Sequence, residues 1–293
     1  MPDVVLLSLG DDASGGGGSA RETTRVPLLT CADALRRGGA RVEIVTAESD
    51  AEIDTAVKAV DAGVAALVVA AGTDGEIRAV VRRLVRRYAP PPSKRPAELP
   101  EGRTVFDLPA LAILPLAPAI PDLVRRLGLP ADPAAVAAAM FGARERRLDL
   151  LRTDSGSVTL HGSLLGGVDE TGRVVPWRCR VEVDGAVLTD GEEPIIACSI
   201  RNAGPSDVDG LPLVAEALPD DGLVDVAVAL STAARRMFRP STVRFEVRRA
   251  RGRAVSVTPR DDEVNLVDDG VPGTLTRKRA WWIEPSAWAV YVM

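Results

Sequence analysis

The feature that most constrains the fold is an apolar run followed by a glycine-containing turn and an amphipathic segment, over residues 65–84. The run Ala65–Ala71 has the length of a strand and lacks helical spacing, which predicts a strand buried on both faces. After the turn Gly72–Gly75, apolar residues recur on one helical stripe. Such a turn directs backbone N–H groups and the positive end of a helix toward an approaching anion. The same unit occurs in every α/β fold, so a purely structural role stays equally open.

Further strands and helices alternate through the first part of the chain, which predicts a parallel sheet with right-handed crossovers. A run of four glycines at 15–18 follows the first strand and is either a flexible loop or a second phosphate-facing loop. The expected strands are 2–9, 41–46, 65–71 and 110–116, and the expected helices are 21–37, 53–62, a helix after Gly75, 122–127 and 134–142.

After about residue 146 the pattern changes to short alternating segments separated by Gly, Asp and Pro, which indicates an antiparallel β-sandwich. The predicted fold class is therefore α/β plus β, with an N-terminal Rossmann-like nucleotide-binding domain followed by a sandwich. We expect the first domain to span 1–130, completed by 280–293, and the sandwich to span 131–279.

Composition excludes several classes of protein. A net charge of −5 gives no global attraction to nucleic acid. The three cysteines lack metal-ligand spacing, which indicates buried thiols in a reducing compartment. No apolar run reaches the length of a membrane span, and the first residues lack the pattern of a signal peptide. We expect a cytoplasmic protein, with peripheral membrane contact and a homodimer left open.

Several segments, taken in order, resemble the diacylglycerol kinase catalytic family, which includes bacterial lipid kinases and sphingosine kinases and is similar to the NAD kinases. Gly72–Glu76 resembles its Gly-Gly-Asp-Gly-Thr turn, and Asp220–Asp225 resembles its Asp-Asp-Gly-Leu-x-Asp segment. The remaining matches are Thr46, Pro115–Ile120, Leu127–Pro130, Arg147–Leu150 and Val267–Pro272.

The resemblance implies an ATP-dependent lipid kinase that phosphorylates a hydroxyl of a lipid, such as diacylglycerol, in the cleft between the domains. It implies ATP and Mg²⁺ as cofactors, Asp74 and Asp269 as catalytic residues, and a structural Mg²⁺ at Asp221 with main-chain carbonyls around Leu218 and Leu223. The nucleotide-binding residues that it implies are Ser8, Thr46, Gly72, Thr73, Asp74 and Gly75.

The chain departs from the family pattern at the phosphate-binding turns. Thr73 replaces a glycine, and Glu76 replaces a threonine and brings a negative charge toward the nucleotide phosphates. Pro115–Ile120 lacks the Gly-Thr-Gly-Asn of the second turn, Val271 replaces a late glutamate, and Ser8-Leu9 replaces Asn-Pro. A catalytically inactive member that binds nucleotide, lipid or protein is therefore the alternative. Phosphorylation of a soluble substrate, as in the NAD kinases, is a third hypothesis.

Each candidate residue also has a structural interpretation. Asp74 is equally suited to cap a helix that begins at Gly75. Asp220–Gly222 is also compatible with a plain turn, and Asp269 is also compatible with a hairpin turn. The arginines at 82, 83, 86 and 87 form either a solvated helix face or a basic patch for anionic lipid. His161 has no recognisable catalytic partner, and Asp261–Glu263 is expected to be a solvated turn.

Overall fold

The computed structural model describes most of the chain and divides it into two compact units. The first unit comprises Met1–Leu148 and Ser286–Met293, and the second comprises Asp149–Pro285. The boundary falls inside two strands, β5 and β18. The described residues are 3–10, 21–61, 65–91, 96–116, 121–166, 174–234, 242–261 and 263–293.

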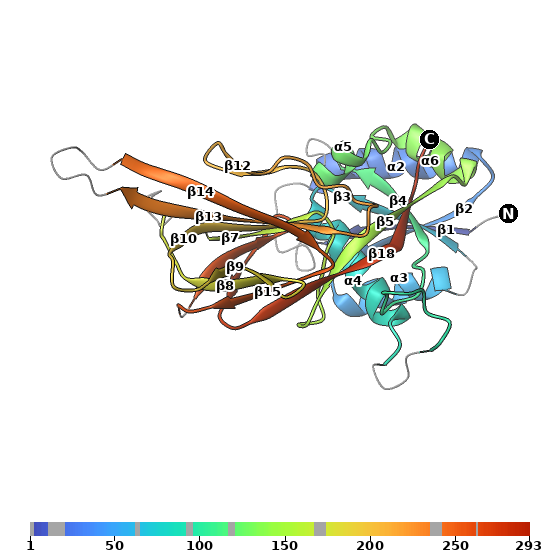
Figure 1. Cartoon of the computed structure of the whole chain (residues 1–293). Coiled ribbons are helices and arrows are strands. Elements are labelled where there is room, and N and C mark those ends of the chain that lie inside the picture. The colour runs from blue at the N-terminus through green and yellow to red at the C-terminus, as the bar shows by residue number, and fades with distance from the viewer. Residues whose placement is uncertain are drawn as a thin grey trace. The chain divides into compact units, whose positions relative to one another are not determined.

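The first unit is a parallel sheet with strand order β2-β1-β3-β4, and the end of β18 pairs in parallel with β4. Helices α2 and α6 pack on one face of this sheet, and α3 and α4 pack on the other (Figure 1). The elements are β1 (Asp3–Leu9), α2 (Arg21–Arg37), β2 (Arg41–Ala47), α3 (Asp50–Asp61), β3 (Ala65–Ala71), α4 (Asp74–Tyr88), β4 (Ala110–Pro115), α5 (Asp122–Leu127), α6 (Pro133–Gly142), β5 (Glu145–Thr153) and β18 (Arg279–Tyr291).

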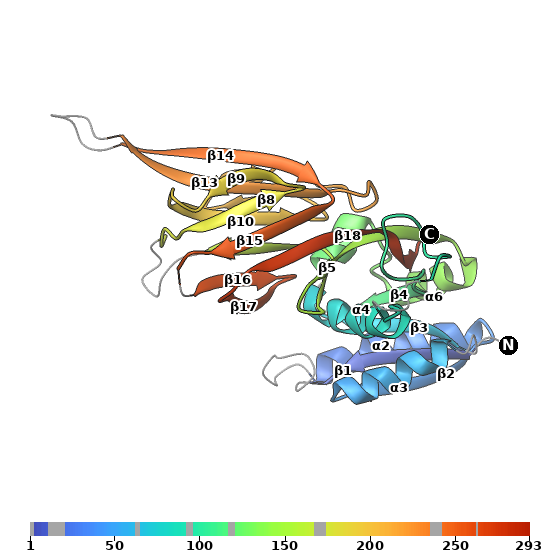
Figure 2. The same ribbon diagram turned by 60° about the horizontal axis from the view of Figure 1, so that its bottom comes forward.

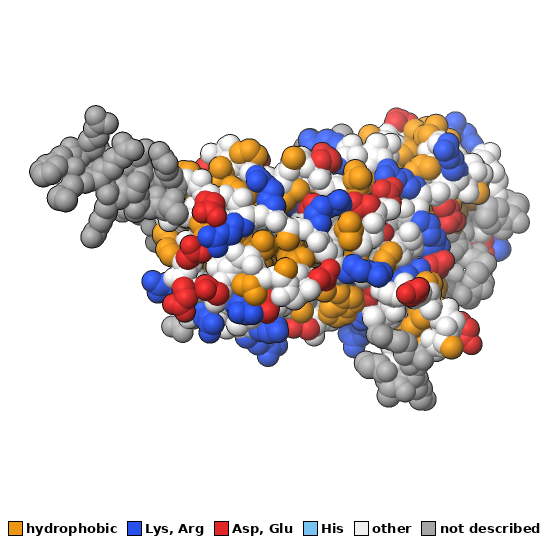
Figure 3. All heavy atoms as spheres, in the orientation of Figure 1, with side chains coloured by type: hydrophobic (Ala, Val, Ile, Leu, Met, Phe, Trp, Pro, Cys, Tyr) orange, Lys and Arg blue, Asp and Glu red, His pale blue; other side chains and the backbone are white. Residues whose placement is uncertain are grey.

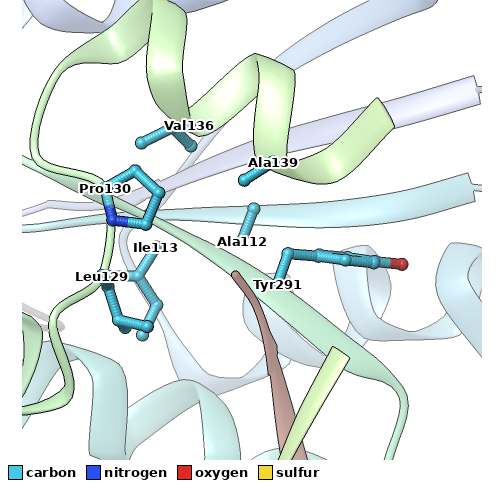
Figure 4. Close-up of a pocket in the computed structure, with 7 residues that line it drawn as sticks. All are labelled: Ala112, Ile113, Leu129, Pro130, Val136, Ala139 and Tyr291. Carbon is cyan, nitrogen blue, oxygen red and sulfur yellow. The ribbon is translucent and has the colours of Figure 1, made fainter. Parts of the chain in front are cut away.

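The apolar runs behave as their composition predicts. The last five residues of β3 and all of β4 are buried, because helices cover both faces of the sheet. Asp132 caps α6 by accepting hydrogen bonds from the N–H groups of Ala134 and Ala135, as expected before Pro133. A gap between α6, β4 and the end of β18 is lined by apolar side chains and has no room for a water molecule (Figure 4). This gap belongs to the core.

The arginine run on α4 is largely an ion-pair network with α3. The side chain of Arg83 is 9% exposed, and its Nε lies 2.6 Å from Asp54 Oδ1. Asp50 contacts Arg83 Nη1 at 2.9 Å and Arg82 Nη2 at 3.0 Å. The interpretation as a solvated face is therefore wrong for Arg83, and two of the four arginines are engaged in holding α3 against α4. Acidic and basic side chains are also interspersed on the surface shown in Figure 3.

The second unit is an antiparallel β-sandwich, as expected. One sheet has the order β14-β13-β10-β7-β16-β17, and the other contains β9, β8, β15 and the first part of β18 (Figure 2). Its apolar core lies between the two sheets and includes Trp177, Trp281 and two buried cysteines. The remaining strands are β6 (Val158–Thr159), β7 (Gly162–Gly166), β8 (Cys179–Val183), β9 (Ala186–Asp190), β10 (Ile195–Arg201), β11 (Ser206–Val208), β12 (Leu211–Val214), β13 (Val224–Ala234), β14 (Thr242–Gly252), β15 (Ala254–Pro259), β16 (Val264–Asp268) and β17 (Val271–Leu275).

The domain boundaries differ from the sequence-based ones. The division at Leu148 comes later than the predicted 130, because α6 packs against α2 and β4 in the core of the first unit. The chain re-enters the first unit at Ser286, later than the predicted residue 280, because Arg279–Ile283 belongs to the sandwich. No helix in the described part of the chain is long and apolar enough to cross a membrane.

Candidate functional site

The polar residues of the first unit meet at the carboxyl edge of its parallel sheet. Ser8 at the end of β1 is in register with Thr46 on β2, and their hydroxyl oxygens lie 3.1 Å apart. Ser8 is also in register with Ala70 on β3, two residues before Gly72. The fold thus brings the expected nucleotide-binding residues of three strands to one edge, where open α/β sheets bind their ligands. The four-glycine run and residues 117–120 lie outside the described residues.

The turn between β3 and α4 is closed by a reciprocal capping box. Thr73 is the N-cap, and its hydroxyl accepts a hydrogen bond from Glu76 N at 3.3 Å. The Glu76 carboxylate turns back, and its Oε2 accepts from Gly72 N at 2.6 Å and from Thr73 N at 3.2 Å. Burial raises the pKa of Glu76, and these two N–H groups partly oppose that rise. The backbone donors that a phosphate would use are therefore occupied by a carboxylate of the same chain.

This geometry corrects the sequence-based interpretation of Asp74. The helix begins at Asp74 instead of Gly75, and its cap is Thr73. The pattern Thr-x-x-Glu at 73–76 is itself a capping-box signal, so the sequence contained the information needed to predict this turn. Thr73 and Glu76 stabilise the turn as a pair, so the two departures from the family pattern take part in one interaction.

Asp74 instead caps a different helix. Its Oδ1 accepts a hydrogen bond from Leu123 N, at 3.0 Å, in the first turn of α5, whose own N-cap Pro121 offers no side-chain acceptor. Burial raises the pKa of Asp74 to about 6; Asp122 raises it further, while the Leu123 N–H and two arginines of α5 lower it. Beside this contact, α5 presents an open hollow of about 280 Å³ lined by Asp122, Arg125 and Arg126.

The raised pKa of Asp74 predicts a pH dependence of stability. The folded state holds the Asp74 proton more tightly than the unfolded state, so stability falls as pH rises from about 4 to about 6. In Asp74→Asn this part of the fall should disappear, while the Asn oxygen still accepts from Leu123 N. Denaturant unfolding at a series of pH values should show the two proteins diverging by on the order of 2 kcal/mol over that interval. Parallel curves would contradict the assignment.

In the second unit, Asp269 occupies the turn of the β16–β17 hairpin. Asp269 and Gly270 form a two-residue loop with φ of 48° and 78°, the backbone of a type I′ turn. The Asp269 carboxylate is almost fully buried and accepts from the N–H groups of Leu160 (2.8 Å), His161 (2.8 Å) and Gly162 (3.0 Å). Burial, and then the neighbouring Asp268, raise the pKa of Asp269 to about 7. These contacts fit the hairpin interpretation, and a catalytic role stays a prediction.

A buried polar cluster surrounds this turn. Asp268 Oδ1 accepts hydrogen bonds from the hydroxyls of Thr159 and Ser163, at 2.6 and 2.8 Å. His161 Nδ1 lies 3.2 Å from Arg201 Nη1. Sequence reasoning left His161 without a partner, because His161 and Arg201 are distant in sequence and meet only when the sandwich forms. A solvated turn was expected at residues 261–263. Asp261 in this segment accepts a hydrogen bond from Arg178 N at 2.6 Å, and residue 262 lies outside the described residues.

Comparison with known proteins agrees with this architecture. Residues 12–153 match the diacylglycerol kinase catalytic domain. A probable lipid kinase, YegS-like, from Stenotrophomonas maltophilia is 29% identical over 222 residues, covering 66% of this chain and 65% of the relative. The solved structure of a diacylglycerol kinase from Bacillus anthracis matches with a TM-score of 0.65 at 16% identity, over 99% of this chain and 97% of the other.

In the segment around Asp221, where the resemblance implies a structural Mg²⁺, both carboxylate oxygens of Asp221 already have partners. Asp221 Oδ1 accepts from Leu223 N at 3.0 Å, and Oδ2 accepts from the guanidinium of Arg251. Arg251 Nε also lies 3.0 Å from Asp225 Oδ1. The described residues contain no group of three or more His, Cys, Asp or Glu side chains that could hold a metal ion. Asp221 takes part in an ion pair with Arg251, and the expected Mg²⁺ site at Asp221 stays a prediction.

Proposed function

We propose that this chain is an ATP-dependent lipid kinase that transfers phosphate to a hydroxyl of a lipid such as diacylglycerol. The observation that carries the proposal is the position of Asp74 on the same turn as Gly72, at the carboxyl edge of the parallel sheet where β1 and β2 also end with Ser8 and Thr46. The match of residues 12–153 to the diacylglycerol kinase catalytic domain supports the reaction class.

In this proposal Asp74 orients and deprotonates the lipid hydroxyl. Its Oδ1 is held by Leu123 N, so the hydroxyl would donate to Oδ2. A carboxyl with a pKa of about 6 is mostly ionised at neutral pH and still basic enough to take a proton. The hydroxyl oxygen then bonds to the γ-phosphorus of ATP as the bond to ADP breaks. Mg²⁺ accompanies the nucleotide and neutralises phosphate charge.

A second candidate function is supported by the capping box itself. The Glu76 carboxylate already accepts from Gly72 N and Thr73 N, so a nucleotide must displace it or bind elsewhere along the edge. On this hypothesis the chain is a catalytically silent member of the family that binds nucleotide, lipid or a protein partner.

Phosphate transfer and nucleotide binding, measured together, separate these functions. The purified chain is incubated with radiolabelled Mg-ATP and diacylglycerol in mixed micelles, and Mg-ATP is titrated by calorimetry. Transfer to the lipid that requires ATP supports the kinase. Binding without transfer supports the silent member, and the absence of both contradicts the kinase. A parallel reaction with NAD⁺ in place of lipid tests the soluble-substrate hypothesis.

Replacing the two capping residues by their family counterparts should strengthen nucleotide binding. Thr73→Gly with Glu76→Thr frees two backbone N–H groups and removes a carboxylate from the phosphate side of the turn. We expect the affinity for Mg-ATP to rise by about tenfold or more, which corresponds to ~1.4 kcal/mol. Calorimetry on the folded variant measures this change.

The chain offers a matched control for that variant in the preceding turn. Glu52 Oε2 accepts from Glu48 N at 2.6 Å, and Ser49 Oγ accepts from Glu52 N at 3.4 Å, so α3 begins with a similar box. Glu52→Thr should cost comparable helix stability and leave nucleotide affinity unchanged. Equal affinities in the wild type and the double variant would show that the β3–α4 turn does not face the nucleotide.

A further inference from the structure

The turn before β13 and the start of β13 each carry a carboxylate that contacts the same cation. Asp221 lies in the turn before β13, and Asp225 lies on β13 directly opposite Arg251 on β14. In the family that this chain resembles, the position of Asp221 holds a structural Mg²⁺. We infer that the guanidinium of Arg251 takes the place of that metal, so that this turn is held without a divalent cation.

The contacts of Arg251 support this substitution. Its Nη2 donates to Asp221 Oδ2 and its Nε lies 3.0 Å from Asp225 Oδ1, so one planar group bridges both carboxylates. A guanidinium offers several N–H donors in a fixed plane, and it can therefore bond to two acceptors at once. The other oxygen of Asp221 is taken by Leu223 N at 3.0 Å. A metal would have to displace Arg251 to reach either carboxylate through the bonded oxygens.

Burial and charge also favour a cation at this place. The side chains of Asp221 and Asp225 are 21% and 14% exposed, so both carboxylates are largely withdrawn from water. Among the described residues, Asp225 Oδ2 is buried and has no hydrogen-bond partner. Burial raises the pKa of Asp225, and Arg251 opposes that rise. Without Arg251, the negative charges of two close carboxylates would not be neutralised. Cations that prefer oxygen ligands, such as Mg²⁺ and Ca²⁺, bind to carboxylates placed in this way.

An adjoining cavity is lined by Asp225 and Arg251 and gives solvent and ions access to them. It has a volume of about 470 Å³ and is lined in part by Glu216, Asp225, Arg249 and Arg251. Arg249 is engaged with main-chain oxygens, at 2.6 Å to Leu213 O and 2.7 Å to Pro212 O, so its guanidinium holds the β12 side of the cavity. Removing the Arg251 side chain would therefore open a path to Asp221 and Asp225 for an ion from solution.

Thermal unfolding of the full chain in EDTA and in MgCl₂, at matched ionic strength, tests the inference. We expect the wild-type Tm to be the same in both solutions. Arg251→Ala should melt at a lower temperature in EDTA, and Mg²⁺ or Ca²⁺ should raise its Tm by about 3 °C or more through binding to the vacated carboxylates. Arg251→Lys, which keeps a positive charge, should not respond to either ion.

A second arginine on β14 serves as the matched control. Arg248 pairs with Glu193 at 2.6 Å and with Glu246 at 2.8 Å, and it lies opposite Val228, three positions along the strand from the Asp225–Arg251 pair. Arg248→Ala should lose these ion pairs and gain no response to Mg²⁺. An Arg251→Ala protein that ignores both ions would overturn the inference. If Arg251→Ala does not fold, calorimetric titration of the wild type with Mg²⁺ tests the inference instead. A wild type that binds no Mg²⁺ supports the inference. A wild type that binds Mg²⁺, and loses this binding in Asp221→Asn, overturns it.

Discussion

Asp74→Asn should reduce ATP-dependent phosphate transfer to a lipid hydroxyl by at least about 100-fold, the usual contribution of a general base. The asparagine oxygen can still accept from Leu123 N, so the contact between α4 and α5 survives while the ability to take a proton is lost. The loss should therefore fall on kcat more than on nucleotide affinity. Steady-state kinetics with diacylglycerol, together with calorimetric Mg-ATP binding, measures both quantities.

The neighbouring carboxylate Asp122 provides the comparison. It lies at the first residue of α5, pairs with Arg125, and lines the hollow beside the Asp74 contact. Asp122→Asn removes a similar negative charge from the same region and should retain most of the activity. If Asp74→Asn remains as active as Asp122→Asn, then Asp74 serves only to cap α5, and the proposed role as a base is wrong.

Much of the fold could be predicted because it depends on local patterns. The runs at β3 and β4 are apolar at consecutive positions, which is sufficient to predict strands buried on both faces. The alternating segments after residue 146 predict the sandwich. β17 itself has no such alternation, because four of its five residues are exposed and it contains Pro272 and Gly273. The common carboxyl edge of Ser8, Thr46 and Gly72 follows directly from parallel pairing.

The contacts that decide the chemistry depend on tertiary structure instead. Asp74 meets Leu123 across 49 positions in the sequence, and Arg251 meets Asp221 across 30. Neither contact has a periodic or motif signal, so neither could be predicted from the sequence, and the roles assigned to Asp74 and Asp221 rest on family resemblance. Glu76 is the exception, because its capping box is local and could have been recognised from Thr73-x-x-Glu76 alone.

Asp269 carries the largest stability effect that we expect from a single polar side chain. In Asp269→Ala the N–H groups of Leu160, His161 and Gly162 lose their shared acceptor inside the sandwich, where water cannot replace it. Each buried donor left unsatisfied costs about 1–3 kcal/mol, so the variant should lose on the order of 3–5 kcal/mol. Denaturant unfolding monitored by tryptophan fluorescence gives this value.

A second hairpin turn of the same kind lies at the surface and serves as a control. It shows whether the loss of stability comes from the burial of the carboxylate or from the turn conformation. Asp184-Gly185, between β8 and β9, has φ of 47° and 85°, and Asp184 accepts from Arg253 N at 2.7 Å and Ala254 N at 2.9 Å. Asp184 is exposed, so in Asp184→Ala water can bond to the freed donors and the cost should be about 1 kcal/mol. Equal losses in the two alanine variants would show that the turn conformation, which both substitutions strain alike, determines the stability. A much larger loss at Asp269 would show that the buried carboxylate is the acceptor that holds residues 160–162 in place.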